Sequence, residues 1–289
     1  MSKIATIINY CTTDYRFLRF CIEEAKKFSQ QIVIPVCTHF FNGEPENRAL
    51  LNQSYQEHPD VQFIEFAYDE EPYGIYCPLT SSEEDWAHYW HSTARYVGFH
   101  FVQECDHVLF LDVDEIVDAT SFSRCDFKAY NAVRLPSYFY FREPIYRAID
   151  QYPLNALLVR KAAIESPEMI LDVLERKGLY DQIQGPKIIY SEPFVHHYSW
   201  VRTKPELVQK VRTWGHRHDR EWLELIEKEF SESFTGIDRI HGFQYETVDR
   251  LHDVLQSVVE KDHSETVYPN VVRVDRRSLF QLDLNKRLM

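Results

Sequence analysis

The sequence predicts an α/β fold with a mostly parallel sheet flanked by helices and with a helical C-terminal extension. The 289 residues are 44% hydrophobic and 27% charged, which is ordinary usage for a globular protein. Short apolar runs alternate with helical patterns over residues 4–115, and this alternation favours parallel strands. After residue 202 the pattern is helical. We therefore expect an α/β domain over residues 1–202 and a helical C-terminal extension over residues 203–289 that packs on it.

Four apolar runs in the first half of the chain predict buried strands. They cover residues 4–10, 32–37, 61–66 and 107–111. Pro35, inside the second run, indicates an edge strand or a bulge, because proline lacks the N–H that a sheet ladder needs. The fourth run is wholly apolar and ends in acidic residues, so its end is the first place to search for a site.

Helical patterns separate these runs. Asp14 is placed to cap a helix whose apolar residues recur at steps of one, three and four. A second helical stretch, with apolar residues along one face, extends over residues 81–101. Beyond it, the runs 133–141 and 156–159 predict further strands without regular helices between them.

The C-terminal part begins with a helix signal. Thr203 and Glu206 form a capping box ahead of an apolar stripe. Later helical patterns cover residues 219–230 and 247–260. The chain shows no internal repeat, low-complexity tract or Gly/Ser linker, so one α/β domain with this extension is the simplest organisation.

Charge and cysteine usage restrict the class of protein. The chain carries 45 acidic and 32 basic residues, a formal net charge of −13, which argues against a dominant nucleic-acid or anionic-membrane surface. The six cysteines lie in the first half without a CxxC pair, as expected for free thiols in a reducing cytosol. The apolar N-terminal run is too short for a signal peptide, and no window approaches the ~20 apolar residues of a transmembrane helix. We expect a cytoplasmic protein.

Two carboxylates follow the fourth strand. Asp112 and Asp114 project to the same face of an extended backbone, at the strand end where open α/β sheets bind ligands. Neighbouring carboxylates repel each other unless a cation lies between them, and a divalent metal in that position also binds a diphosphate. The alternative is that Asp112 caps the next turn and that Asp114, Glu115 and Asp118 belong to a solvated loop.

This region carries a family resemblance. The stretches RYVG (95–98) and HVLFLDVDE (107–115) resemble the DxD region of GT-A fold nucleotide-sugar glycosyltransferases, especially the family 2-like group. In that group an Arg, with a Gly three residues later, lies on the helix before the DxD strand. The residue after the Arg is usually Asn, whereas here it is Tyr96. The order of elements over residues 4–115 is also similar to the Rossmann-like nucleotide-binding half of the GT-A catalytic domain.

The resemblance implies roles for five residues. Asp112 would contact ribose or sugar hydroxyls, and Asp114 would coordinate Mn²⁺ or Mg²⁺ bridging the two phosphates. Tyr10 and Asp14 bound the segment that would meet the base and ribose. Arg95 would approach the nucleotide from its helix; its alternative role is a surface charge on an amphipathic helix.

A second dense patch covers residues 193–204. Because adjacent residues of a strand point to opposite sides, only one of His196 and His197 faces a given site. Many GT-A enzymes take a late-chain His as an additional metal ligand, so the resemblance implies one of these two, and we favour His197 slightly over His196. The alternative is that one imidazole packs in the core and the other is solvated.

Aromatic and basic residues follow the histidine pair. Trp200 would stack on a sugar, and Arg202 and Lys204 would stabilise the departing diphosphate. A third cluster, residues 214–220, is either a phosphate or acceptor clamp or a turn between helices. The loop 41–47 lies where a base-reading loop would be, although its turn residues alone explain its composition.

The predicted function is metal-dependent glycosyl transfer from a nucleotide-diphosphate donor to a hydroxyl acceptor such as a glycan. A UDP-sugar is expected from its prevalence in the group, and the family 2-like resemblance implies inversion, with a carboxylate removing the acceptor proton. Asp181 and Glu192 are the candidates for that base.

Two other functions remain open at this point. A haloacid-dehalogenase-like phosphatase also ends an apolar strand in DxD, but its motif normally lies on the first strand and continues with Gly-Thr rather than with Glu115-Ile116. A non-catalytic nucleotide-sugar-binding protein is the other alternative, because no general base is evident from the sequence.

Overall fold

The computed structural model describes residues 2–67, 83–171, 175–255, 267–275 and 278–279, and for residues 83–88 it describes the backbone alone. The expected helix start at residue 81 lies outside these residues. The cysteines at 11, 21, 37, 105 and 125 are free thiols. No helix in the described part of the chain is long and apolar enough to cross a bilayer.

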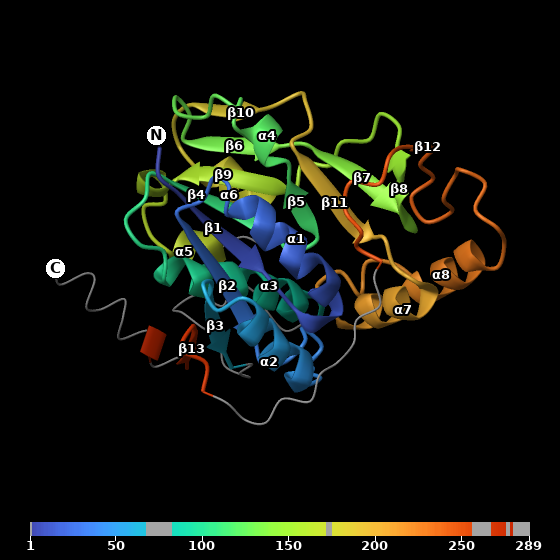
Figure 1. The fold of residues 1–289 in the computed structure, drawn as a ribbon, viewed down its shortest axis with the longest axis horizontal. Helices are drawn as coiled ribbons and strands as arrows, with labels where there is room; N and C mark the ends of the chain where they lie inside the picture. Colours follow the sequence, from blue (N-terminus) through green and yellow to red (C-terminus); the bar gives the residue numbers. More distant parts are fainter. Residues whose placement is uncertain (1, 68–82, 172–174, 256–266, 276–277, 280–289) are drawn as a thin grey trace.

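A central sheet of eight described strands forms the middle of the molecule (Figure 1). Its strands are β1 (Ile4–Asn9), β2 (Gln31–Cys37), β3 (Gln62–Phe66), β4 (His107–Asp112), β6 (Ala132–Leu135), β9 (Ala156–Arg160), β10 (Lys187–Ile189) and β13 (Val271–Val274). Their order is β10-β6-β9-β4-β1-β2-β3-β13. Neighbours pair in parallel except around β9, which is antiparallel to β4 and β6. The predicted α/β fold with a mostly parallel sheet is confirmed.

A second sheet adjoins the first. Its five described strands are β5 (Glu115–Val117), β7 (Ser137–Phe141), β8 (Glu143–Ala148), β11 (Val195–Trp200) and β12 (Tyr245–Thr247), in the order β12-β8-β7-β11-β5. The predicted strand over 133–141 is two strands, β6 and β7. They belong to different sheets, and Pro136 lies between them.

Helices cover both faces of the central sheet and one side of the second. They are η1 (Thr12–Asp14), α1 (Tyr15–Ala25), α2 (Arg48–Glu57), α3 (Glu83–His100), α4 (Ala119–Phe122), η2 (Lys161–Ala163), α5 (Glu168–Leu171), α6 (Arg176–Gln182), α7 (Lys204–Thr213) and α8 (Trp222–Phe230). Ile4 and Ile8 of β1 pack with apolar residues of α1 and α2, whereas Ala5 and Ile7 pack with those of α3. Burial on both faces explains why β1 is a continuous apolar run.

Gly98 allows α3 to approach the sheet closely. A Cβ at this position would lie 2.8 Å from Ile7 Cγ2 and 3.3 Å from Pro35 Cγ. The expectation that Pro35 marks an edge is wrong, since β2 lies between β1 and β3. The proline is tolerated because the ladder between β1 and β2 ends at Val33. The close approach places Arg95, one turn before Gly98, next to the end of β4.

The segment after residue 202 packs on the second sheet. Apolar residues of α7 and α8 join those of β7 and β11 in one cluster, and the predicted capping box at Thr203 is present. The predicted helix over 247–260 is wrong over the described residues: Thr247 ends β12, and residues 248–255 contain no helix. β13 pairs with β3 in the central sheet, so the extension contains strands as well as helices.

Candidate active site

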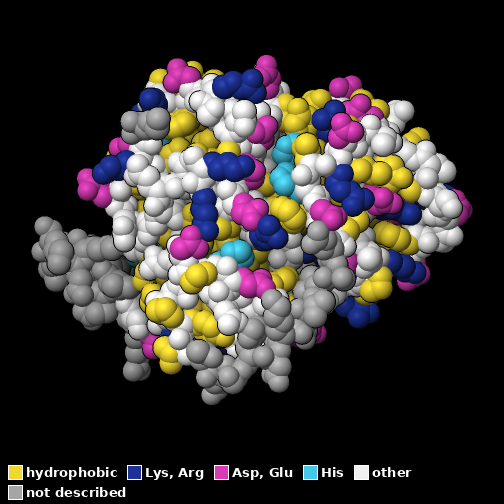
Figure 2. All heavy atoms as spheres, in the orientation of Figure 1, with side chains coloured by type: hydrophobic (Ala, Val, Ile, Leu, Met, Phe, Trp, Pro, Cys, Tyr) yellow, Lys and Arg dark blue, Asp and Glu magenta, His cyan; other side chains and the backbone are white. Residues whose placement is uncertain are grey.

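A cavity of about 250 Å³ lies at the carboxyl ends of β1, β2 and β4. Helix α3, the start of α6, strand β11 and the end of α7 also contribute to its wall. Asp112 ends β4 in the central sheet and Glu115 begins β5 in the second sheet, so the turn between them connects the two sheets. The N–H of Tyr198 on β11 donates to the Asp114 carbonyl at 2.9 Å and fixes this turn. On the face in Figure 2, acidic and basic side chains are interspersed.

Asp112 is held on three sides. Its Oδ1 lies 3.1 Å from Arg95 Nη2 and 3.3 Å from His91 Nε2, and its Oδ2 lies 3.0 Å from Arg176 Nη2. Burial favours the neutral acid, but Arg176, His91 and Arg95 together outweigh it and hold the pKa of Asp112 well below its usual range. Arg95 is buried and does not line the cavity, so it contacts Asp112 from behind.

Asp114 lines the cavity, and its two carboxylate oxygens contact different partners. Oδ2 accepts from Lys210 Nζ at 2.8 Å and lies 3.6 Å from Arg202 Nη2. Oδ1 lies 3.7 Å from His197 Nε2. Burial raises the pKa of Asp114, but Lys210, His197 and Arg202 prevail and lower it. The carboxylate is therefore ionised and turned toward both a lysine and an imidazole.

The two adjacent histidines face different surroundings, as their spacing predicts. His197 lines the cavity, and its Nδ1 pairs with the Asn155 amide at 3.2 Å, which fixes the ring orientation. His196 does not line the cavity; its Nδ1 pairs with the Tyr140 hydroxyl at 2.9 Å, and its ring stacks on Tyr138. The structure brings only His197 to Asp114.

The basic residues that line the cavity are not the ones predicted to stabilise the diphosphate. Arg202 is fully buried, pairs with Asp14 and donates to the Thr13 carbonyl at 2.8 Å, so it fixes the segment after β1. Lys204 pairs with Glu227 at 2.7 Å and does not line the cavity. Lys210 does line it, although sequence reasoning missed it. The signal was a lysine on the buried stripe of α7.

Three other predicted residues do line the cavity. Tyr10 is buried, with its hydroxyl 2.8 Å from Ser54 Oγ. Asp14 faces Arg202 and lies 3.7 Å from Lys210 Nζ. It occupies the predicted cap position of α1, but its side chain makes no capping hydrogen bond. Trp200 packs at 5.7 Å between ring centroids from Trp222 and presents part of its surface to the cavity.

The predicted bases lie elsewhere. Asp181 pairs with Lys177 at 2.6 Å on the exposed side of α6, and Glu192 is exposed in the loop before β11. Neither lines the cavity. Glu175, immediately before α6, does line it and was missed, because nothing in the sequence indicates that α6 packs beside β4. His216, from the cluster 214–220, also reaches the cavity.

Two lining side chains, those of Asp114 and His197, are candidate ligands for a divalent ion. Asp114 Oδ1 and His197 Nε2 converge on the cavity, and burial lowers the pKa of His197 to about 4, so its imidazole is the neutral form that binds metals. Among the described residues no three His, Cys, Asp or Glu side chains form a metal-binding group. One carboxylate and one imidazole would leave coordination positions for phosphate oxygens and water.

Comparisons with known proteins gave distant likenesses of fold. No family model and no curated protein matches the sequence. A glycosyltransferase involved in glycosylation of the major capsid of PBCV-1 is 16% identical, with a TM-score of 0.35 over 71% of this chain and 96% of that one. The galactosyltransferase LgtC, in complex with donor and acceptor sugar analogs, is 14% identical, with a TM-score of 0.39 over 79% and 97%.

A Drosophila β-1,4-galactosyltransferase 7 mutant, in complex with manganese, UDP-Gal and xylobiose, is 11% identical, with a TM-score of 0.33 over 81% of this chain and 82% of that one. These values describe a remote similarity of shape with glycosyltransferases. They assign no activity and no family to the chain, so the functional conclusion depends on its own cavity.

Proposed function

We propose that this protein is a glycosyltransferase that moves a sugar from a nucleotide-diphosphate donor to a hydroxyl acceptor. One observation carries the proposal. The cavity at the carboxyl ends of β1, β2 and β4 brings the strand-end carboxylates Asp112 and Asp114 together with the cations Arg176 and Lys210. This combination suits a ligand that has both hydroxyl groups and a diphosphate.

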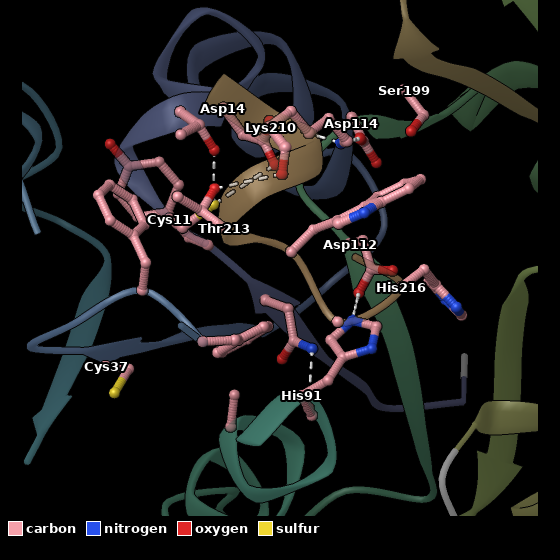
Figure 3. Close-up of a pocket in the computed structure, with 18 of the residues that line it drawn as sticks. Cys11, Asp14, Cys37, His91, Asp112, Asp114, Ser199, Lys210, Thr213 and His216 are labelled. Atoms are coloured by element: carbon pink, nitrogen blue, oxygen red, sulfur yellow. Dashed lines mark hydrogen bonds and ion pairs between the residues drawn. The ribbon is translucent and has the colours of Figure 1, made fainter. Parts of the chain in front are cut away.

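The donor has a natural orientation in the cavity. Tyr10 and Cys37 line one end, next to the loop after β2, and would border the nucleoside. Figure 3 shows Asp112 and His216 on the side away from Cys37, so the donor sugar belongs beside Asp112. Trp200 supplies an apolar surface for that sugar.

Positive charge at the diphosphate is the main requirement of this site. Five described lining residues carry a carboxylate, whereas two, Arg176 and Lys210, carry a permanent positive charge. Mn²⁺ (or Mg²⁺), held by Asp114 and His197, supplies the additional charge when it is bound. Lys210 and Arg176 face the departing diphosphate in place of the predicted Arg202 and Lys204. A positive charge about 4 Å from a phosphate oxygen contributes about 4 kcal/mol at an effective dielectric of about 20.

The contacts of Asp112 disfavour phosphatase chemistry. In that alternative Asp112 would be the phosphoryl nucleophile, yet both its oxygens are bound by guanidinium groups that lower its pKa and its nucleophilicity. Turnover of a nucleotide sugar distinguishes an enzyme from the alternative, a non-catalytic nucleotide-sugar-binding protein. We further propose transfer with inversion, and UDP-sugars are the first donors to test.

The test uses the purified chain and a panel of nucleotide-diphosphate sugars. Thermal shift with and without Mn²⁺ identifies the donor, and release of nucleoside diphosphate then measures turnover. In Asp114→Asn we expect metal-dependent turnover to be lost and the far-ultraviolet circular dichroism to be unchanged, because the amide keeps the shape but loses the charge. Unchanged activity would remove Asp114 from the site, and release of phosphate from phosphomonoesters alone would overturn the proposal.

A further inference from the structure

Carboxylates and imidazoles alternate along one border of the cavity. Glu175 Oε1 lies 3.2 Å from His216 Nε2 and 3.7 Å from His91 Nδ1. His216 Nδ1 lies 2.9 Å from Asp219 Oδ2 on the other side. The donor binding proposed above does not involve these contacts. One of the imidazoles, that of His91, is nevertheless connected to the donor site, because its Nε2 lies 3.3 Å from Asp112.

Glu175 is positioned to meet an acceptor. It lines the cavity, and 37% of its side-chain surface is exposed, but Oε1, which faces the two imidazoles, is buried. An acceptor hydroxyl therefore has to reach the other oxygen, Oε2. The two imidazole neighbours of Glu175 lie at the sugar end of the cavity, as Figure 3 shows for His91 and His216. The same end holds Asp112, beside which the donor sugar is proposed to lie.

The other carboxylates of the wall are engaged differently. Asp14, Asp112 and Asp114 each pair with arginine or lysine. Glu46 accepts from the Thr12 backbone N–H at 3.1 Å, beside the segment after β1 and thus toward the nucleoside end. Glu175 instead lies between two imidazoles, those of His91 and His216.

We infer that Glu175 is the base that takes the proton from the acceptor hydroxyl, and that His216, held by Asp219, positions it. This inference rests on the proposed glycosyl transfer. The acceptor oxygen forms a bond to the anomeric carbon while the bond from that carbon to the diphosphate oxygen breaks. The bonding pair leaves with the nucleoside diphosphate, and the hydroxyl proton passes to the Glu175 carboxylate.

The charges around Glu175 keep it ionised, so it carries no proton of its own before the reaction. His91 and Arg95 face it from α3, His216 from the loop after α7, and Arg176 follows it in sequence. Burial raises the pKa of Glu175, but His216 and His91 outweigh burial and hold it well below its usual range. Removing His216 therefore raises this pKa, and the acid limb of the rate profile moves to higher pH.

The experiment compares variants on the UDP-sugar that gives the largest thermal shift, with Mn²⁺ and with free monosaccharides or water as acceptor. Glu175→Gln should lower kcat by about 100-fold or more, because general-base catalysis contributes factors of this size. Its donor Kd should be unchanged, which also shows that the variant is folded. His216→Gln should move the acid limb of kcat/KM to higher pH. Asp181→Asn, on the exposed side of the helix that follows Glu175, is the matched control.

The outcomes separate this inference from the function on which it rests. Wild-type protein that neither binds nor turns over any nucleotide sugar would overturn the proposed function. Wild-type turnover that Glu175→Gln retains in full would overturn only the assignment of the base. An acid limb that does not move in His216→Gln would overturn the positioning role of the imidazole.

Discussion

Lys210 is one of two described lining residues that bring a permanent positive charge to the cavity wall. It lies on the buried side of α7, with its ammonium 2.8 Å from Asp114 Oδ2 and 3.7 Å from Asp14 Oδ1. A fixed cation between two carboxylates reduces their mutual repulsion and remains close to the expected diphosphate. Its position 96 residues from Asp114 in the chain explains why local sequence patterns did not connect the two.

Lys210→Met tests this role, since methionine keeps the length of the side chain and removes the charge. We expect kcat for donor cleavage to fall by about 100-fold, a typical loss when one donor to a developing anion is removed. Lys204→Met is the control, because Lys204 pairs with Glu227 outside the cavity. Equal losses in the two variants would contradict a specific role for Lys210.

Glu46 gives a second prediction at the residue scale, because the protonation of its carboxyl group affects the stability of the fold. Burial raises its pKa to about 7, although hydrogen bonds from Thr12 oppose the rise. The unfolded chain releases this proton near pH 4.3, whereas the folded protein retains it up to about pH 7. Its contribution to folding is therefore fully present below about pH 4.3 and is lost as the pH rises through 7.

As the pH rises from about 5 to about 8, the free energy of unfolding of the wild-type protein should fall relative to that of Glu46→Gln, by up to about 3 kcal/mol. Thermal unfolding across this range measures the difference. Glu44→Gln, exposed in the same loop, should show no such difference. A difference between wild type and Glu46→Gln that is independent of pH would contradict the raised pKa.

At the scale of elements, the sequence predicts what depends on local pattern. The apolar runs locate β1 to β4, and the alternation of side chains along β11 predicts that only one of His196 and His197 reaches the site. The base candidates Asp181 and Glu192 could not be placed in this way. The position of α6 depends on Arg176, whose Nη1 and Nη2 lie 2.5 and 2.6 Å from the Glu115 carboxylate, a contact between distant parts of the chain.

For helix α3, too, local sequence patterns predict some features, whereas contacts with distant parts of the chain determine others. Its apolar face and the pair Arg95 and Gly98 are evident in the sequence. That Gly98 fits against Ile7, and that Arg95 thereby supports Asp112 rather than lining the cavity, depends on packing. A motif thus predicted the neighbourhood of these residues, and the three-dimensional contacts determine their roles.

At the scale of the whole molecule, the boundary at residue 202 passes through the cavity. Residues 203–289 contribute Lys210 and Thr213 to its wall, apolar residues of α7 and α8 to the second sheet, and β13 to the central sheet. We therefore propose that the two predicted parts form one cooperative unit, although the sequence pattern changes between them.

A fragment of residues 1–202 tests that proposal. Without α7 and α8, the apolar side of the second sheet is exposed, so we expect loss of the cooperative thermal transition seen in the full chain. Donor binding should be lost with it, because Lys210 is absent. A fragment that unfolds cooperatively and binds the donor would instead establish residues 1–202 as an independent catalytic domain.

The turn from Asp112 to Glu115 links the last residue of β4 in one sheet to the first residue of β5 in the other. For inhibitor design, this seam means that a rigid molecule touching both Asp112 of β4 and His197 of β11 would contact both sheets. Such a compound would gain selectivity from the spacing between the sheets as well as from the chemistry of either wall. A fragment confined to the nucleoside end would gain nothing from that spacing.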